Sequence, residues 1–251
     1  FDLARTAEGD LYIVGATTAG LSAGSNPQPA LAGDADAFLA RLDPALRPGL
    51  IAYYGGQGAD IARSVALDGR GLAYLAGATS SPDLPLSATA PQRAYGRGGR
   101  DAFVAGLDAR SGALVFSTYL GGAGAEGEHI DLAIDAAGDL YLTGATTSPN
   151  FPTRNALQRA LHGATTSDAF ISRLRPSSGE LIFSTFFGGE RDDFGAGVAI
   201  DPTGAIMVTG GTASAFFPLT RPFQERGAGS SDAFVARLSG DEFAVLLESF
   251  E

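Results

Sequence analysis

The sequence predicts an all-β fold made of four repeated, four-stranded antiparallel units. Three observations support this prediction. The tripeptide Asp-Ala-Phe occurs four times at spacings of 64 to 67 residues, starting at Asp36, Asp101, Asp168 and Asp232. A string of the form Gly-x5-Gly-x-Thr precedes each copy, ending at Thr17, Thr79, Thr146 and Thr212. An aromatic-rich segment ending in Gly-Gly closes three of the units, at residues 53–56, 119–122 and 186–189. Self-similarity at a long fixed period indicates a repeat architecture.

The third unit shows its strands most clearly. Alternating apolar residues and β-branched or aromatic residues predict strands at 131–135, 140–145, 168–174 and 181–187. Tight turns containing glycine separate the first strand from the second and the third from the fourth. Only the connection between the second and third strands is long, and we expect a short helix within it at 154–161.

Radial repetition of four-stranded antiparallel units is typical of a β-propeller, in which each unit is one blade. We expect one propeller domain over residues 1–251, with blades at 1–56, 57–122, 123–189 and 190–251. An open stack of β units is the alternative, but such stacks normally have a shorter period and capping units. The four blades would either close as a ring by themselves or form part of a larger ring.

In these motifs the chain resembles the bacterial seven-bladed β-propeller repeat family. The family pattern runs through Gly-Gly, an acid, Gly-x-Thr, Phe-Pro-Thr and Asp-Ala-Phe, and the third unit keeps Phe151, Pro152 and Thr153 intact. The first unit departs from it, with Asn26 and Pro27 in place of Phe-Pro. The resemblance covers the whole chain and implies a bacterial protein that is secreted or attached to the cell envelope. It brings no catalytic residues.

Composition excludes several classes of function. The chain has 28 acids against 17 bases and a net charge of −11, so a phosphate-backbone binder is not expected and we predict no nucleic-acid partner. No apolar stretch approaches the roughly 18 residues of a membrane span. Cysteine is absent, which excludes disulfides, thiolate metal sites and thiol nucleophiles. All the basic residues are arginine, which excludes lysine chemistry.

An acid follows each Gly-Gly pair by four residues, at Asp60, Glu126 and Asp193. These acids lie where the chain passes from one blade to the next. Three carboxylates near one channel mouth would hold a hard cation such as Ca²⁺, the only cofactor that the sequence suggests. In the alternative reading, each acid accepts backbone N–H groups across the junction between two blades.

The other repeated acids have a structural interpretation. The aspartate of each Asp-Ala-Phe is expected to cap the start of a strand by accepting nearby N–H or hydroxyl hydrogen bonds. Asp68, Asp135 and Asp201 end strands and precede glycine-containing turns, which is typical of Asx turns.

Candidates for catalysis are few. The two histidines, His129 and His162, lie in different connections of the third unit, and no nucleophile elbow, P-loop or dinucleotide fingerprint is present. Acids near His129 could form an acid–base or metal site, but we interpret this segment as a solvated acidic turn.

Arginine is concentrated in the loops at 80–100, 147–167 and 213–231, which hold seven arginines against two acids, a net charge of +5. The rest of the chain carries −16, so one rim of an acidic body is basic. A solvated rim with a few anchoring bonds is the alternative to a binding face. The candidate binding residues are Arg93, Arg97, Arg154, Arg159, Arg221 and Arg226.

The sequence therefore predicts a non-enzymatic, extracellular or cell-surface module that is structural or adhesive. It would bind through its loop face or associate with itself, with the aromatic residues Tyr95, Phe151, Phe216 and Phe217 adding apolar contact. Candidate partners are a second copy, another surface protein or a polysaccharide. The alternative is a secreted enzyme acting on polysaccharide with a metal or acid site at the channel mouth.

Overall fold

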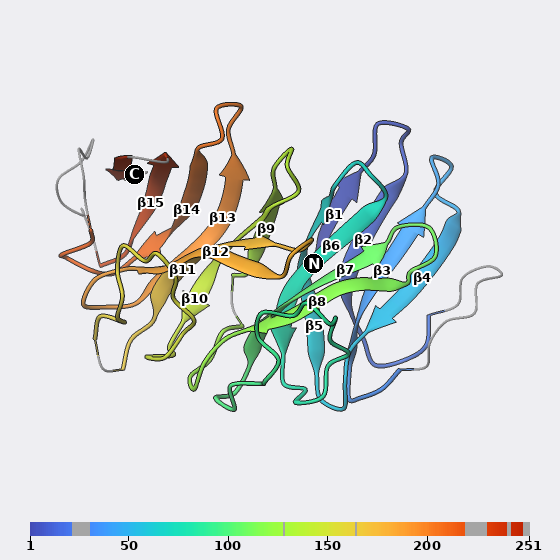
Figure 1. Ribbon diagram of the computed structural model, residues 1–251, viewed down its shortest axis with the longest axis horizontal. Coiled ribbons are helices and arrows are strands. Elements are labelled where there is room, and N and C mark those ends of the chain that lie inside the picture. Colours follow the sequence, from blue (N-terminus) through green and yellow to red (C-terminus); the bar gives the residue numbers. More distant parts are fainter. Residues whose placement is uncertain (22–30, 128, 164, 219–229, 240–241, 248–251) are drawn as a thin grey trace.

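Four antiparallel β-sheets, each of four strands, make up the protein in the computed structural model (Figure 1). The structure describes residues 1–21, 31–127, 129–163, 165–218, 230–239 and 242–247. These residues contain no helix, and so none that could span a membrane. The predicted all-β class and the four four-stranded antiparallel units are confirmed.

The first two sheets run through the N-terminal half of the chain. The strands of the first sheet are β1 (Asp2–Arg5), β2 (Leu11–Thr17), β3 (Asp36–Leu42) and β4 (Pro48–Tyr54). Those of the second sheet are β5 (Asp60–Leu67), β6 (Leu72–Thr79), β7 (Asp101–Asp108) and β8 (Leu114–Leu120). Each strand pairs with its neighbour in the sequence, because short turns favour antiparallel pairing of consecutive strands.

The last two sheets repeat this order. The strands of the third sheet are β9 (Asp131–Ile134), β10 (Leu140–Thr146), β11 (Asp168–Arg175) and β12 (Glu180–Phe187). Those of the fourth sheet are β13 (Asp193–Ile200), β14 (Ile206–Thr212), β15 (Asp232–Ser239) and β16 (Glu242–Leu247). The four strands predicted for the third unit therefore coincide with β9 to β12 to within a residue or so at each end.

The Gly-x-Thr and Asp-Ala-Phe motifs of each unit are paired with each other in the sheet. In every sheet the threonine that ends the second strand lies opposite the aspartate that starts the third. The pairs are Thr17 with Asp36, Thr79 with Asp101, Thr146 with Asp168 and Thr212 with Asp232. The long loop between these two residues, the start of the first strand and the end of the fourth all lie at this end of each sheet, which we call the loop end. The short hairpin turns lie at the opposite end, the turn end.

The hydrophobic core lies between the sheets. Three clusters of buried apolar side chains fill the seams between the first and second, second and third, and third and fourth sheets. Side chains alternate across each strand, so one set of residues contacts the preceding sheet and the other contacts the following sheet. In the first seam, Tyr12 and Leu39 pack against Val65 and Phe103. The sheets are thus held together face to face, as in sheet-on-sheet packing.

Asx turns close the first hairpin of the last three sheets, as predicted. Asp135 Oδ1 accepts the backbone N–H groups of Ala137 and Asp139 at 2.9 and 3.0 Å. Asp68 and Asp201 bond their own turns in the same way. Gly138 and Gly204 in these turns have φ values of 92° and 84°, which other residues adopt only with strain.

The helix predicted at 154–161 is wrong. This segment is extended and lies along β12, where Arg154 and Ser184 exchange backbone hydrogen bonds of 2.8 and 2.9 Å. Phe186 then donates to the carbonyl of Gln158 at 3.2 Å. The outer edge of β12 offers unpaired backbone groups, and pairing with them satisfies the loop better than an isolated short helix would.

The sheets follow one another in a row, and the first does not share a core cluster with the fourth. Figure 1 shows the first sheet on the right and the fourth on the left. In the part of the chain that the structure describes, the four sheets do not close into a ring by themselves, which was one of the two expected arrangements.

Candidate functional site: paired carboxylates and an arginine-bearing loop end

Each seam contains a fully buried carboxylate at the loop end, and Asp60 illustrates its surroundings. Its backbone N–H donates to the carbonyl of Ala35 in the preceding sheet at 2.7 Å. Its Oδ2 accepts the N–H of Gly56 and the hydroxyl of Ser81, both at 2.8 Å. Asp60 therefore links the end of the first sheet to the second sheet through both backbone and side chain.

The same arrangement, a buried acid that accepts backbone and hydroxyl hydrogen bonds at the loop end, recurs at the next two seams; we call each of these arrangements a corner. Glu126 accepts the N–H of Gly122 at 3.0 Å, the hydroxyl of Thr146 at 2.6 Å and that of Ser148. Asp193 accepts the N–H of Gly189 at 2.6 Å and the hydroxyl of Ser214 at 2.8 Å. Burial raises the pKa of all three acids, and the hydroxyl and N–H donors oppose this rise.

A second carboxylate stands beside each of these acids. It belongs to the Asp-Ala-Phe motif of the preceding sheet and accepts a backbone N–H from its own long loop. The bonds are Ala32 to Asp36 at 2.7 Å, Gly96 to Asp101 at 2.8 Å and His162 to Asp168 at 3.0 Å. The predicted capping role of these three aspartates is confirmed.

The first glycine of each Gly-Gly pair separates the two carboxylates. A Cβ on Gly55 would lie 2.5 Å from Asp36 Oδ1 and 2.7 Å from Asp60 Oδ2. Real side chains do not approach so closely, so only glycine fits at this point. The Gly-Gly motif is thus explained by the acids: its first residue leaves room for them, and its second donates an N–H to one of them.

The paired carboxylates disfavour ionisation of each other. Burial, with a smaller contribution from the charge of Glu126, raises the pKa of Asp101 to about 7. Burial raises the pKa of Asp168 to about 6, with Asp193 contributing in the same direction. Two buried like charges at one site favour retention of a proton by one of them. Asp101 therefore keeps a proton at a higher pH than an exposed aspartate does.

Several carboxylate oxygens at these corners lack a hydrogen-bond partner. Within the described residues they are the Oδ1 atoms of Asp36, Asp60, Asp101, Asp168 and Asp193. Those of Asp36 and Asp168 lie 2.5 and 2.8 Å from the points at which a Cβ on Gly55 and on Gly188 would stand. A proton on one member of each pair removes the cost of burying two charges.

The three acids predicted to share a calcium ion, Asp60, Glu126 and Asp193, lie at three separate seams. Across the described part of the chain, no three histidine, aspartate or glutamate side chains are grouped so that they could hold a metal ion. Each of the three acids instead bonds backbone and hydroxyl donors across its own seam. This is the alternative arrangement that the sequence left open.

The candidate arginines of the loop end are exposed where the structure describes them. Arg93, Arg97, Arg154 and Arg159 project from the second and third long loops, together with Arg100. Arg93 Nη1 donates to the carbonyl of Ser87 at 2.8 Å, which anchors its loop. Arg221 and Arg226 lie outside the described residues. The structure therefore places four of the six candidates on the surface, three of them in the long loops and Arg154 beside Glu180, which starts β12 at the turn end of the third sheet.

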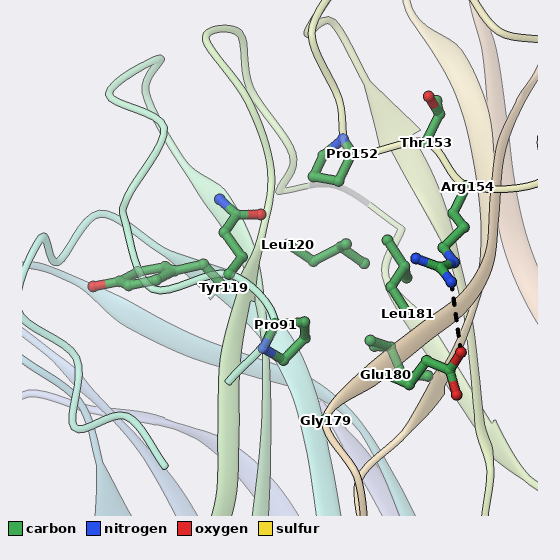
Figure 2. Close-up of a pocket in the computed structure, with 11 residues that line it drawn as sticks. Pro91, Tyr119, Leu120, Pro152, Thr153, Arg154, Gly179, Glu180 and Leu181 are labelled. Atoms are coloured by element: carbon green, nitrogen blue, oxygen red, sulfur yellow. Dashed lines mark ion pairs between the residues drawn. The ribbon is translucent and has the colours of Figure 1, made fainter. Parts of the chain in front are cut away.

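One cleft of about 420 Å³ opens where the second long loop and the end of β8 meet the third long loop and the hairpin between β11 and β12, and Arg154 is the candidate arginine that lines it. Figure 2 shows Pro91, Leu120 and Leu181 in its wall, with Arg154 facing Glu180. The Arg154 and Glu180 side chains approach to 3.6 Å and are 56% and 44% exposed. An ion pair this exposed contributes little to stability, so Arg154 remains available to an anionic ligand.

A larger cleft of about 900 Å³ lies at the turn end between the first and second sheets. Sequence reasoning missed it. Arg5, Arg41, Arg70 and Arg110 line it, together with Glu8, Asp10 and Asp108. Arg41 is held by Asp10 at 2.6 Å, so the charges of this cleft are largely balanced internally. The only sequence signal was the recurrence of arginine in or beside hairpin turns.

The histidines take part in packing. The ring of His129 stacks on Phe194 with centroids 4.3 Å apart. His162 Nδ1 lies 3.0 Å from the carbonyl oxygen of Gly188. Of the acids near His129, Asp131 accepts the N–H of Val198 in the neighbouring sheet at 2.8 Å, and Glu126 is fully buried and so does not belong to a solvated turn. These residues do not converge on one point.

Comparison with known proteins gives no relative from which a role can be transferred. The chain matches no family model and no curated protein. Its function is therefore argued from the arrangement of the sheets, the buried corners and the exposed loop end.

Proposed function

We propose that the protein is a β-propeller module whose four sheets are successive blades. The resemblance of its repeats to the bacterial seven-bladed propeller family supports this, as does the recurrence of one packing arrangement at all three seams. The first strands are also joined: Val65 N–H donates to Asp2 at 3.0 Å, and Val198 N–H donates to Asp131 at 2.8 Å. First strands that follow one another in this way would line the channel of a propeller.

The module is non-enzymatic and serves as a structural or adhesive part of a bacterial surface protein. The acids with pKa values near 6 and 7, Asp168 and Asp101, are fully buried and cannot touch a substrate. They give no support to the alternative of a polysaccharide-degrading enzyme. Polar groups at the seams are used to join blades, which leaves the exposed loops to make contact with partners.

The arginine-bearing long loops bind an acidic polysaccharide. The observation that carries this proposal is the set of exposed arginines in the second and third long loops, of which Arg154 lines an open cleft. Arginine binds carboxylate groups in a bidentate manner. Acids lie among the arginines of the turn-end cleft, whereas the described parts of the second and third long loops carry a single acid, Asp83. Acidic surface polysaccharides carry carboxylates at regular spacing and fit such a face.

Retention on immobilised polygalacturonate, with neutral dextran as the comparison, tests this function. We expect retention on polygalacturonate only, and expect it to be lost in about 0.5 M salt, where the screening length is a few ångströms. Changing Arg93, Arg97, Arg154 and Arg159 together to serine should abolish retention. A matched control changes four exposed arginines of the turn end to serine: Arg5, Arg47, Arg70 and Arg110. Equal loss in both variants, or equal retention on dextran, would overturn the proposal.

A further inference from the structure

Arg154 differs from the other candidate arginines in having an internal partner. Of the four candidates that the structure describes, Arg154 alone has a carboxylate within ion-pair distance, that of Glu180 at 3.6 Å. At this distance the two charges attract each other without a direct hydrogen bond. Glu180 therefore holds Arg154 loosely, in a position that the carboxylate of a ligand could take over.

A second arginine holds Glu180 from the other side. The Oε2 atom of Glu180 lies 3.7 Å from Nη1 of Arg175, its cross-strand partner in the hairpin of β11 and β12. Arg175 is itself fixed, because its Nε and Nη2 atoms donate to the buried carboxylate of Asp139, both at 2.9 Å. Glu180 thus keeps a cationic neighbour when Arg154 turns toward a ligand. Arg154 is the member of this group that can move.

The ion pair supplies the two charged side chains that line the cleft of about 420 Å³ (Figure 2). The apolar part of the wall includes Pro91, Leu120 and Leu181. Two polar lining residues are used internally: the hydroxyl of Tyr119 donates to a backbone carbonyl at 2.7 Å, and the amide oxygen of Gln92 accepts a backbone N–H at 3.0 Å. A carboxylate that enters the cleft must therefore bind Arg154 in the presence of Glu180.

We propose that Glu180 competes with ligand carboxylates for Arg154 and so keeps single carboxylates out of the cleft, an inference that rests on the proposed function. A lone carboxylate in place of Glu180 would exchange one exposed ion pair for another, and its immobilisation would oppose binding. A ligand with several carboxylates gains more, because the candidate arginines without an internal partner supply further contacts.

Arg159 is well placed for a second contact. It belongs to the segment that lies along β12, where Arg154 and Gln158 pair with positions only two residues apart. Two residues of a strand span about 7 Å, so Arg154 lies close to Gln158, the residue before Arg159. A carboxylate bound at Arg159 raises the effective concentration of the next one beside Arg154. Glu180 thereby discriminates between ligands by the number of carboxylates that they carry.

A chemical-shift titration with sodium galacturonate measures the affinity for a single carboxylate, and neutral galactose is the comparison. Glu180→Gln keeps the shape of the side chain and removes its charge, so we expect galacturonate to bind about two- to fivefold more tightly than to the wild type. Affinity for galactose should not change. Glu180 is half-exposed, so the variant should fold. Glu8→Gln, the same change at an exposed acid outside this cleft, is the matched control and should bind as the wild type does.

A double variant, Glu180→Gln with Arg154→Ser, shows whether the effect acts through Arg154. The gain in affinity should disappear, because the guanidinium for which Glu180 competes is gone. Equal affinity of the wild type and Glu180→Gln, an equal gain in Glu8→Gln, or a gain that persists without Arg154 would overturn the role of Glu180. No retention of the wild type on polygalacturonate, together with the expected gain for Glu180→Gln, would overturn the proposed function and leave the competition for Arg154 in place.

Discussion

Asp168 and Asp193 lie on opposite sides of Gly188, and an oxygen of each is 2.8 Å from the point at which a Cβ on that glycine would stand. Asp168 starts a strand of the third sheet, and Asp193 starts the first strand of the fourth. One buried acid from each of two sheets therefore meets at a residue that has no side chain. The same relation links Asp36 with Asp60 and Asp101 with Glu126.

Replacing Gly188 with alanine should destabilise the protein, because its Cβ would be forced against two carboxylates. Overpacking of this kind costs about 1–3 kcal/mol of the free energy of unfolding. Gly49→Ala is the matched control, because its Cβ would have a single neighbour 3.9 Å away, the carbonyl oxygen of Arg41. Urea unfolding measures both variants. Equal stability of the two would contradict the role assigned to the paired acids.

Acidification from pH 8 to about pH 5 should stabilise the protein. The pKa values of Asp101 and Asp168 are raised to about 7 and about 6, above the ordinary value of 3.8 for an unfolded chain. The folded state therefore binds protons more tightly, and this stabilisation is lost as pH rises through 6 and 7. A folded-state pKa that lies one pH unit above the unfolded value corresponds to roughly 1.4 kcal/mol. The melting temperature measured across this range gives the sign directly.

Asp101→Asn isolates the source of this dependence. Asparagine resembles a protonated aspartate in shape and carries no charge, so the variant should be more stable than the wild type at pH 8 and less dependent on pH. Below about pH 4 stability should fall again, because the pKa of Asp201 is lowered to about 2 by hydrogen bonds from Thr203 and Ala205. A melting temperature that rises steadily from pH 5 to pH 8 would show that the sign is wrong.

The sequence was sufficient to predict the strands, because alternation and turn residues act locally. The boundaries of β10 and β11 follow from the Gly-x-Thr and Asp-Ala-Phe motifs, and Asp135 was identified as a turn residue from its context. The helix predicted at 154–161 was wrong because the conformation of this segment is not determined locally. Its conformation depends on the distant edge of β12, with which it exchanges backbone hydrogen bonds, and no local pattern shows that edge.

The corners were predicted only in part. The acid after each Gly-Gly pair was recognised, but its partners Ser81, Ser148 and Ser214 were not, although each follows the repeated threonine by two residues. The predicted association surface included Phe151 and Phe217, which the structure buries in the second and third seams at 3% and 6% exposure. Phe216 is 83% exposed. Alternation predicts two sides of a strand, but neighbouring sheets decide which side is covered.

Ser148→Ala should lower stability by about 1–3 kcal/mol, because the N–H of Gly124 would lose its acceptor and Glu126 would lose one of its donors. The Ser148 hydroxyl donates to Glu126 and also supports the turn by accepting the N–H of Gly124 at 2.8 Å. Ser178→Ala, in an exposed turn, is the control and should change stability little. An effect of Ser148→Ala no larger than that of the control would show that Glu126 does not depend on this hydroxyl.

Calcium and EDTA should leave the melting temperature unchanged. A cation bound at a hundredfold excess over its dissociation constant would stabilise the fold by about 2.7 kcal/mol. Asp60, Glu126 and Asp193 already accept hydrogen bonds from backbone and hydroxyl donors at separate seams, so no such gain is expected. A rise in melting temperature with calcium that EDTA reverses would contradict this expectation and restore the metal site.

Asp131 joins three sheets, and its removal should cost more than that of any exposed acid. Its Oδ1 accepts the hydroxyl of Ser64 in the second sheet, and its Oδ2 accepts the N–H of Val198 in the fourth, both at 2.8 Å. Asp131→Ala leaves the N–H of Val198 without an acceptor in a seam, and a loss of about 1–3 kcal/mol is expected for that group alone.

Asp34→Ala serves as the control for this prediction, because it also removes one negative charge but from an exposed loop position. Stability in a repeat protein depends on the contacts between neighbouring units, so weakening two seams at once should also let the fourth sheet unfold before the first three. Urea unfolding followed by two probes should therefore give transitions that coincide for the wild type and for Asp34→Ala and separate for Asp131→Ala. Coincident transitions in all three proteins, with equal midpoints, would mean that apolar packing alone holds these seams together.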